Sequence, residues 1–245
     1  MLLFSFLKKS FGLKKLTLLM MLLAVFSLET LVAQNDLWIQ KDDLGDGSTG
    51  LKRSGAVSFT ILGKIYIALG KDGSTYHTDL WQYDTITEAW TQKADFTGGG
   101  RAGAFAMVMN NKAIVGTGEA AGGARTNTVF KYEPVSNVWT SIANFSGGVR
   151  TYASAFSMGT RGFVLGGDDG SFRNDLWEYN INTNSWIGRQ AFPGTARMKA
   201  VAFTIGTLAY YGTGDIGAGA PSKDFWQYNI VTNNWTQLPD FAGAA

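Results

Sequence analysis

One pattern of residues recurs four times along this chain, and the repeat constrains the fold more than any other feature. Each copy runs from an Arg through short apolar stretches and a variable polar loop to a Tyr, with a Trp always seven residues after that Tyr. The Arg recurs in steps of 48, 49 and 47 residues, at Arg53, Arg101, Arg150 and Arg197. The paired aromatics are Tyr83 and Trp90, Tyr132 and Trp139, Tyr179 and Trp186, and Tyr228 and Trp235. A fixed period of this length indicates a propeller or a solenoid.

Each copy has room for four short strands. The apolar stretches are rich in Phe, Val, Ile and Tyr, and Gly, Asn, Asp and Thr separate them, which is typical of strands joined by tight turns. We expect one strand after the Arg, one ending at a Gly pair, one carrying a Trp and the Tyr, and one starting at the second Trp. A unit of about 50 residues with four antiparallel strands is a propeller blade. The Trp and Tyr side chains are predicted to pack in its core, because they bury large areas.

These residues resemble the Kelch repeat family, whose markers are a Gly pair, a Tyr and a Trp a few residues later. The third copy carries them as Gly166-Gly167, Tyr179 and Trp186, and the resemblance covers about residues 36–241. The other copies depart modestly from the pattern: the Gly pair becomes Leu69-Gly70, Thr117-Gly118 and Thr213-Gly214, and Phe130 replaces the first Trp of the second copy.

The two ends of the repeat array raise a question of closure. Residues 35–41 match the outermost strand that begins at Trp90, yet the array also ends on such a strand at Trp235. The prediction is an all-β, Kelch-type β-propeller over residues 34–245, with four complete four-stranded antiparallel blades and an extra outer strand. The repeats span about residues 38–89, 90–138, 139–185 and 186–234. Two hypotheses stay open: the chain is the front of a longer propeller of about five to seven blades, or a four-bladed ring with a displaced strand.

Residues 1–33 have the pattern of a secretory signal peptide. Four Lys precede an apolar stretch from Leu16 to Leu28, and Ala33 offers a small residue for cleavage before Gln34. The stretch is shorter than the roughly 20 residues that span a bilayer, so we expect no membrane span after cleavage. The localisation predicted is secreted, periplasmic or cell-surface. Subtracting the four Lys and Glu29 from the chain's 21 basic and 19 acidic residues leaves 17 and 18, so nothing favours a nucleic-acid partner.

The composition offers few groups for catalysis or metal binding. The chain has no Cys and a single His, His77, which argues against multi-His or Cys metal sites and against copper chemistry like that of galactose oxidase. The Asp-rich segments at 42–47 and 168–170 lack the spacing of a calcium loop and are typical of turns. We therefore predict no cofactor, no metal and no catalytic residue.

The candidate binding site lies on one face of the disc, where the loop before each first strand and the loop between each second and third strand both emerge. The first kind of loop carries the four repeated Arg, and the second comprises residues 71–78, 119–127, 168–174 and 215–223. The candidate ligand-binding residues are Arg53, Arg101, Arg150, Arg197, Glu119, Asp168, Asp215, Arg125 and Arg173.

The repeated Arg has two interpretations. In one, four guanidinium groups surround the mouth of the central channel and bind a carboxylate or phosphate. The Kelch resemblance supports this, since several members, among them ubiquitin-ligase adaptors and sialic acid mutarotases, bind acidic ligands through Arg at a similar place. In the other, each Arg ties one blade to its neighbour, because an acid stands eighteen residues later in three copies, as Glu119, Asp168 and Asp215.

Regular blades with variable loops and no catalytic set favour a binding function. The prediction is an exported, non-enzymatic recognition scaffold that contacts a protein or glycan partner, acidic in character, through the face bearing the repeated Arg. The alternative is a carbohydrate-active enzyme resembling the sialic acid mutarotases.

Overall fold

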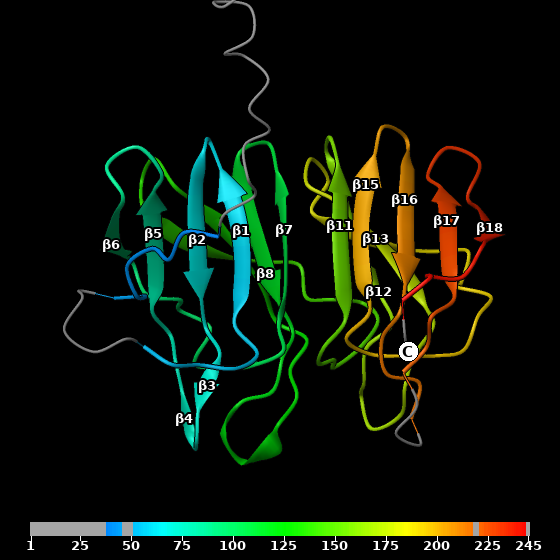
Figure 1. Ribbon diagram of the computed structural model, residues 1–245, viewed down its shortest axis with the longest axis horizontal. Helices are drawn as coiled ribbons and strands as arrows, with labels where there is room; N and C mark the ends of the chain where they lie inside the picture. Colours follow the sequence, from blue (N-terminus) through cyan, green and yellow to red (C-terminus); the bar gives the residue numbers. More distant parts are fainter. Residues whose placement is uncertain (1–37, 46–50, 218–220, 244–245) are drawn as a thin grey trace, which may run out of the picture. The chain divides into compact units, whose positions relative to one another are not determined.

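The computed structural model describes residues 38–45, 51–217 and 221–243 (Figure 1). The leader predicted over residues 1–33 and part of the strand predicted over 35–41 therefore lie outside the described residues. The chain divides into two units, Met1–Lys41 and Asp42–Ala245, and the fold described below is that of the second. Residues 38–41 of the first unit are not in a strand. Among the described residues, no helix is long and apolar enough to cross a membrane.

The described residues of the second unit form four antiparallel sheets of four strands each. Blade 1 consists of β1 (Val57–Ile61), β2 (Lys64–Ala68), β5 (Leu80–Asp84) and β6 (Ala89–Lys93). Blade 2 consists of β7 (Phe105–Met109), β8 (Lys112–Gly116), β9 (Val129–Glu133) and β10 (Val138–Ile142). Blade 3 consists of β11 (Ser154–Met158), β12 (Arg161–Leu165), β13 (Leu176–Asn180) and β14 (Ser185–Arg189). Blade 4 consists of β15 (Val201–Ile205), β16 (Leu208–Gly212), β17 (Phe225–Asn229) and β18 (Asn234–Leu238).

Short connections hold each sheet in register. Asn110 and Asn111 both have positive φ, 50° and 56°, in the two-residue turn between β7 and β8, which is the turn whose twist suits a hairpin. The loops between second and third strands are longer. Blade 1 places there a small hairpin of β3 (Lys71–Asp72) and β4 (Thr75–Tyr76), and blade 2 a short 3-10 turn, η1 (Ala121–Gly123). Figure 1 shows both loops projecting from the lower end of the sheets.

The first strand of each blade packs against the first strand of the next, in the order β1, β7, β11, β15 (Figure 1). We call the side of a blade that meets the following blade its leading face, and the opposite side its trailing face. The leading faces present large residues, with Phe59, Met107 and Phe156 at one repeat position, all buried. The trailing faces present small ones at the preceding position, with Ala106, Ala155 and Ala202. Large side chains against small ones build one apolar core at each interface between blades.

The repeated Tyr and Trp also fasten neighbouring blades together by hydrogen bonds. The Tyr179 hydroxyl donates to Asn184 Oδ1 at 2.8 Å, and the same oxygen accepts the backbone N–H of Ala143 from the preceding blade at 3.0 Å. The Trp186 indole N–H donates to the Ala143 carbonyl at 3.1 Å. The same set recurs with Tyr132, Asn137, Trp139 and Ala94, and with Tyr228, Asn233, Trp235 and Gln190. The predicted fold class, an all-β propeller of four-stranded antiparallel blades, is confirmed.

Candidate functional site

The two kinds of loop predicted to share one face lie side by side. Ser54, next to the first repeated Arg, exchanges backbone hydrogen bonds of 2.9 Å with Lys71 at the start of the variable loop of blade 1. Equivalent bridges join Ala102 to Glu119, Thr151 to Asp168, and Met198 to Asp215. We call this side of the blades the loop face; it is the lower side in Figure 1.

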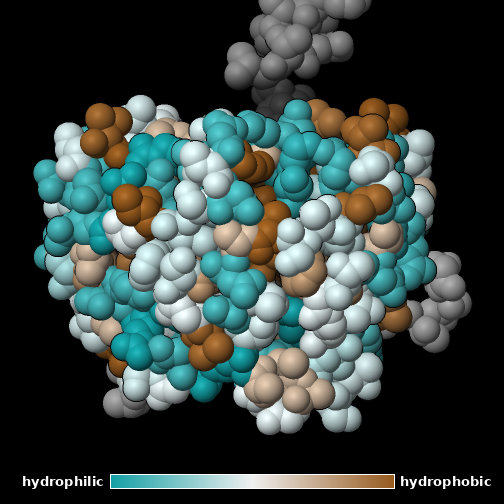
Figure 2. Space-filling view, turned by 180° about the vertical axis from the view of Figure 1, so that it is seen from behind, coloured by the Kyte–Doolittle hydropathy of each residue, from teal (hydrophilic) through white to brown (hydrophobic). Residues whose placement is uncertain are grey.

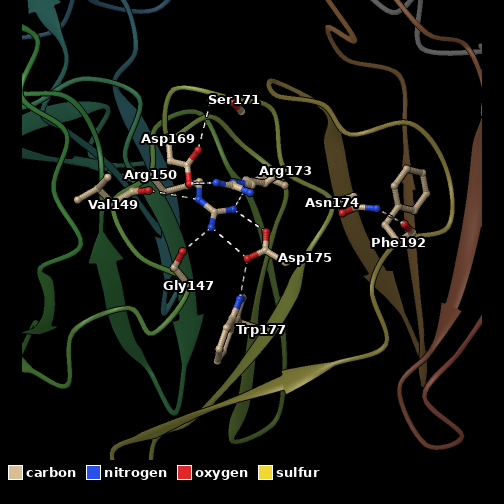
Figure 3. A network of polar contacts seen from close by, with 11 residues as sticks. Gly147, Val149, Arg150, Asp169, Ser171, Arg173, Asn174, Asp175, Trp177 and Phe192 are labelled. Atoms are coloured by element: carbon tan, nitrogen blue, oxygen red, sulfur yellow. Dashed lines mark hydrogen bonds and ion pairs between the residues drawn. The ribbon is translucent and has the colours of Figure 1, made fainter.

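The guanidinium of Arg150 is buried within its own blade rather than turned toward solvent. It forms a two-pronged ion pair with the Asp175 carboxylate, at 2.6 and 3.0 Å, and donates to the carbonyls of Gly147 at 2.6 Å and Gly166 at 2.9 Å. Its side chain is 1% exposed. The Trp177 indole N–H donates to the same carboxylate at 2.7 Å, completing the network in Figure 3. Groups of the protein itself therefore bind both terminal nitrogens of the Arg150 guanidinium.

Two other blades repeat this Arg–Asp–Trp network. Arg53 binds Asp79 at 2.6 and 2.7 Å, and Arg197 binds both oxygens of Asp224. Burial alone would raise the pKa of the Asp79 and Asp224 carboxyls, but hydrogen bonds from the Arg and from the Trp at each site outweigh it and lower both pKa values below their ordinary range. The side chains of Arg53 and Arg197 are 4% and 1% exposed.

Sequence reasoning expected the wrong pairing partner for these Arg residues. The acids that bind Arg53, Arg150 and Arg197 stand 26, 25 and 27 residues later, at the start of the third strand, and not eighteen residues later. The ion pair also lies within one blade. The link between blades comes from the Arg backbone, since the Gly118 N–H donates to the Arg150 carbonyl at 2.7 Å.

Blade 2 lacks the counter-charge. Thr128 stands where the other blades have Asp, and Arg101 donates to its hydroxyl at 3.1 Å and to the Thr117 carbonyl at 3.1 Å. Phe130 replaces the Trp and supplies no N–H, while the Arg101 guanidinium lies 4.8 Å from the ring centre of Phe96. Burial without a neighbouring carboxylate lowers the pKa of Arg101 to about 10.

Two of the three acids expected to pair with the repeated Arg, Glu119 and Asp168, instead bind residues of the preceding blade's loop. Glu119 accepts a hydrogen bond of 2.7 Å from the Tyr76 hydroxyl. Asp168 forms an ion pair of 2.8 Å with Arg125. Asp215 accepts the Gly217 backbone N–H at 2.8 Å, and no cation pairs with it among the described residues. Arg173 pairs with Asp169 inside its own loop at 2.7 Å. These loop residues are partly exposed, unlike the repeated Arg.

Sequence reasoning missed two residues at the inner edge of the loop face. The residue two positions after each repeated Arg has a left-handed backbone; it is Gly55, Gly103, Tyr152 and Lys199 in the four blades, with φ of 66°, 65°, 53° and 57°. A backbone ladder joins these positions, as Gly103 N–H donates to the Gly55 carbonyl, Tyr152 to Gly103 and Lys199 to Tyr152, at 2.8, 2.7 and 3.0 Å. The signal for this position was the Gly two residues after the Arg in the first two repeats.

Tyr152 and Lys199 form a platform on the loop face, just before the inner strands β11 and β15. A Cβ atom on Gly55 would stand 3.3 Å from the Tyr152 hydroxyl, and one on Gly103 would stand 3.0 Å from its ring, so the two glycines leave room for the aromatic side chain. The Lys199 ammonium lies 4.9 Å from the centre of that ring, and Lys199 is exposed. Left-handed backbone at a residue other than Gly is strained, and such strain gathers at binding sites.

The remaining candidate chemistry is sparse. His77 has its Nε2 atom buried with no hydrogen-bond partner among the described residues. Within those residues, no group of three or more Asp, Glu or His side chains is placed to hold a metal ion.

Comparison with known proteins agrees with the repeat and the sheet topology. A family model described as the Kelch motif matches residues 52–97, which make up the first blade. A solved structure titled "Structure of YjhT" is similar to this chain with a TM-score of 0.69 and 18% identity, over 80% of this chain and 68% of that one. The chain therefore has the fold of a Kelch-type β-propeller. No curated protein matches this chain in sequence. At this level of identity, the likeness to the solved structure shows the fold alone.

Proposed function

We propose that this Kelch propeller is an exported, non-enzymatic recognition scaffold that binds a carboxylate-bearing ligand on its loop face. The observation that carries the proposal is the platform of Tyr152 and Lys199. Both residues have a left-handed backbone, a conformation that costs about 1–2 kcal/mol of free energy for a residue with a side chain. Blades 1 and 2 have Gly at the same position. An aromatic ring beside an exposed ammonium offers a stacking surface and a charge for an acidic sugar or peptide.

In this proposal the repeated Arg does not contact the ligand through its guanidinium, as the sequence led us to expect, but supports the platform. Its guanidinium carries a structural ion pair in three blades. In blades 2, 3 and 4 its backbone carbonyl accepts a Gly N–H from the preceding blade, two residues before the ladder position that Tyr152 and Lys199 occupy. In this proposal Arg53, Arg101, Arg150 and Arg197 position the platform. The partly exposed Arg125, Arg173, Glu119, Asp168 and Asp215 surround it and set the ligand's specificity. Export rests on the leader predicted over residues 1–33.

Substitution by Gly tests the platform with little effect on the fold. Lys199→Gly and Tyr152→Gly install the residue that blades 1 and 2 already carry, so relief of strain offsets the added freedom of the unfolded chain. The free energy of unfolding is expected to stay within about 1 kcal/mol, measured by urea titration. Binding on an array of acidic glycans and peptides is expected to fall about tenfold or more for Lys199→Gly, since a hydrogen bond to a charged group contributes about 1.5–3 kcal/mol.

The array needs a matched control and a test for catalysis. Lys93→Gly removes a Lys from the outer strand β6 and is expected to leave binding unchanged. Array binding that survives both platform substitutions would contradict the proposal. The enzymatic alternative predicts faster exchange between the anomers of a sialic acid in NMR spectra, so exchange at the buffer rate supports a binding scaffold.

A further inference from the structure

The leading face of blade 4 is uncovered. Val201, Phe203 and Ile205 of β15 are 56%, 41% and 63% exposed, although the residues at the position of Phe203 in the other blades are buried against the next blade. Tyr210 and Phe225 extend the patch, and their rings stack at 5.9 Å between centres. On the side seen in Figure 2, by contrast, apolar side chains lie in small groups among hydrophilic ones.

This face is more apolar than the leading faces that the chain does cover. The leading faces of blades 1 and 2 carry ion pairs, between Lys64 and Asp84 and between Lys112 and Glu133. Blade 4 has Leu208 and Asn229 at these positions. A terminal repeat that faces water normally has a polar outer side. The composition of this face is therefore that of an interface.

Backbone groups at the two ends of the blade array complement each other. At each interface between blades, the inner ladder supplies one hydrogen bond, as from the Gly103 N–H to the Gly55 carbonyl, and a second runs back from the Gly70 N–H to the Arg101 carbonyl, both at 2.8 Å. The equivalent groups of blade 4 are the Lys199 carbonyl and the Gly214 N–H, and among the described residues neither forms the corresponding hydrogen bond.

Blade 1 offers the matching set on its trailing face. Its Gly55 N–H and Arg53 carbonyl lack these bonds within the described part of the chain. The face also presents small residues, Ser58 and Thr60, both exposed. At the equivalent positions of blade 4, Ala202 packs in the cluster of Phe156 and Thr204 donates to the Ser157 carbonyl of blade 3. Ile65 adds an exposed apolar side chain to it.

We infer that two copies of this chain associate head to tail, with the leading face of blade 4 of one copy on the trailing face of blade 1 of the other. The contact repeats the interface that already joins blades within the chain: it would cover Phe203 and supply both missing backbone hydrogen bonds. Such a contact is heterologous, because it joins two different surfaces. It closes into a two-chain ring of about eight blades, the upper end of the usual propeller range, or grows into a longer assembly.

Light scattering coupled to gel filtration tests the inference through the mass of the purified chain. The expected mass is twice that of one chain, which is 26.5 kDa with residues 1–33 included, or a higher multiple. Phe203→Glu and Ser58→Arg each disrupt one of the two surfaces and are expected to give monomers. An equimolar mixture of the two variants retains one intact pair of surfaces and is expected to recover a dimer. Ile86→Glu, at an exposed turn away from both surfaces, is the control and should keep the wild-type mass.

Two results would overturn the inference. One is a monomeric wild-type chain at micromolar concentration, which would mean that the exposed face awaits another occupant, such as a further blade of a longer polypeptide. The other is an assembly that survives Ser58→Arg but not Phe203→Glu, because two copies would then pair through their blade 4 faces. Circular dichroism melting curves of each variant show that a change of mass does not reflect unfolding.

Discussion

Replacing Thr128 by Asp is expected to stabilise the protein, because it supplies the counter-charge that Arg101 lacks. The other three blades show the geometry that the new side chain would adopt, such as the Arg150–Asp175 pair with its oxygens at 2.6 and 3.0 Å. Arg101 is 3% exposed, and its present partners are carbonyl oxygens and the Thr128 hydroxyl. Its attraction to a carboxylate would therefore be only weakly screened by solvent.

The net gain follows from opposing terms. Removing one partner of a buried ion pair destabilises a protein by about 3–5 kcal/mol, which sets the scale of an Arg left without its acid. Against this stand the burial of a new carboxylate and the loss of the Thr128 hydroxyl, which contacts the Thr126 hydroxyl at 3.0 Å. We expect a net increase of about 1–2 kcal/mol in the free energy of unfolding, or about 4 °C in melting temperature for a domain of this size.

The assay is a thermal melt at neutral pH, and the repeat provides its own comparisons. Thr128→Asp combined with Phe130→Trp rebuilds the whole network of the other blades, so the double variant should be the more stable. The reverse change, Asp175→Thr, gives blade 3 the pattern of blade 2 and should lower the free energy of unfolding by about 1.5–3 kcal/mol, because Asp175 is 36% exposed and solvent screens part of the ion pair. A melting temperature below wild type for Thr128→Asp would refute the reasoning, because burial of the carboxylate would then outweigh its attraction to Arg101.

Two further predictions concern stability. The folded-state pKa values of Asp79 and Asp224 are lowered, so their ion pairs stabilise the protein fully above the unfolded pKa of about 3.9. This stabilisation is lost as the pH falls through the folded pKa values, so melting temperatures should drop steeply below about pH 4. A flat melting profile in that range would contradict this prediction. Asn184→Ala removes the acceptor of the Tyr179 hydroxyl and should lower the free energy of unfolding in urea by about 2–3 kcal/mol. Asn184→Gly suits the φ of 50° and should lose less stability than Asn184→Ala. Unchanged stability in both variants would contradict the prediction, because the hydrogen bond would then contribute nothing.

The interface between blades explains why the repeat spacing alone predicted so much. A strand pattern of period two, interrupted by tight turns, has one stable outcome when it recurs about every 48 residues, because each sheet must bury both faces against its neighbours. The recurring Tyr residues were therefore predicted to be core residues, and Tyr132, Tyr179 and Tyr228 are buried. The Asn that binds the Tyr hydroxyl stands five residues later in three repeats, so its spacing was visible while its function was not.

Which side chains form ion pairs depended on the course of the loops, and this course cannot be read from residue spacing. Asp168 and Asp175 both follow Arg150 in the sequence, and spacing favoured the first. The variable loop instead carries Asp168 toward Arg125 of the preceding blade and returns Asp175 to the start of β13, under the guanidinium. A Coulombic attraction acts through space, so the partner was decided only when the loop had folded.

The sequence by itself determined the blades of this protein: their number in the chain, their strands, their aromatic packing and the side on which the loops emerge. These follow from local periodicity and from the need to bury apolar faces. The tertiary structure alone decided that the repeated Arg is a buried structural residue, that Tyr152 and Lys199 occupy a left-handed position before the inner strands, and that the face of Phe203 is left uncovered. Backbone dihedral angles and exposure are properties of the folded chain, and residue type does not specify them.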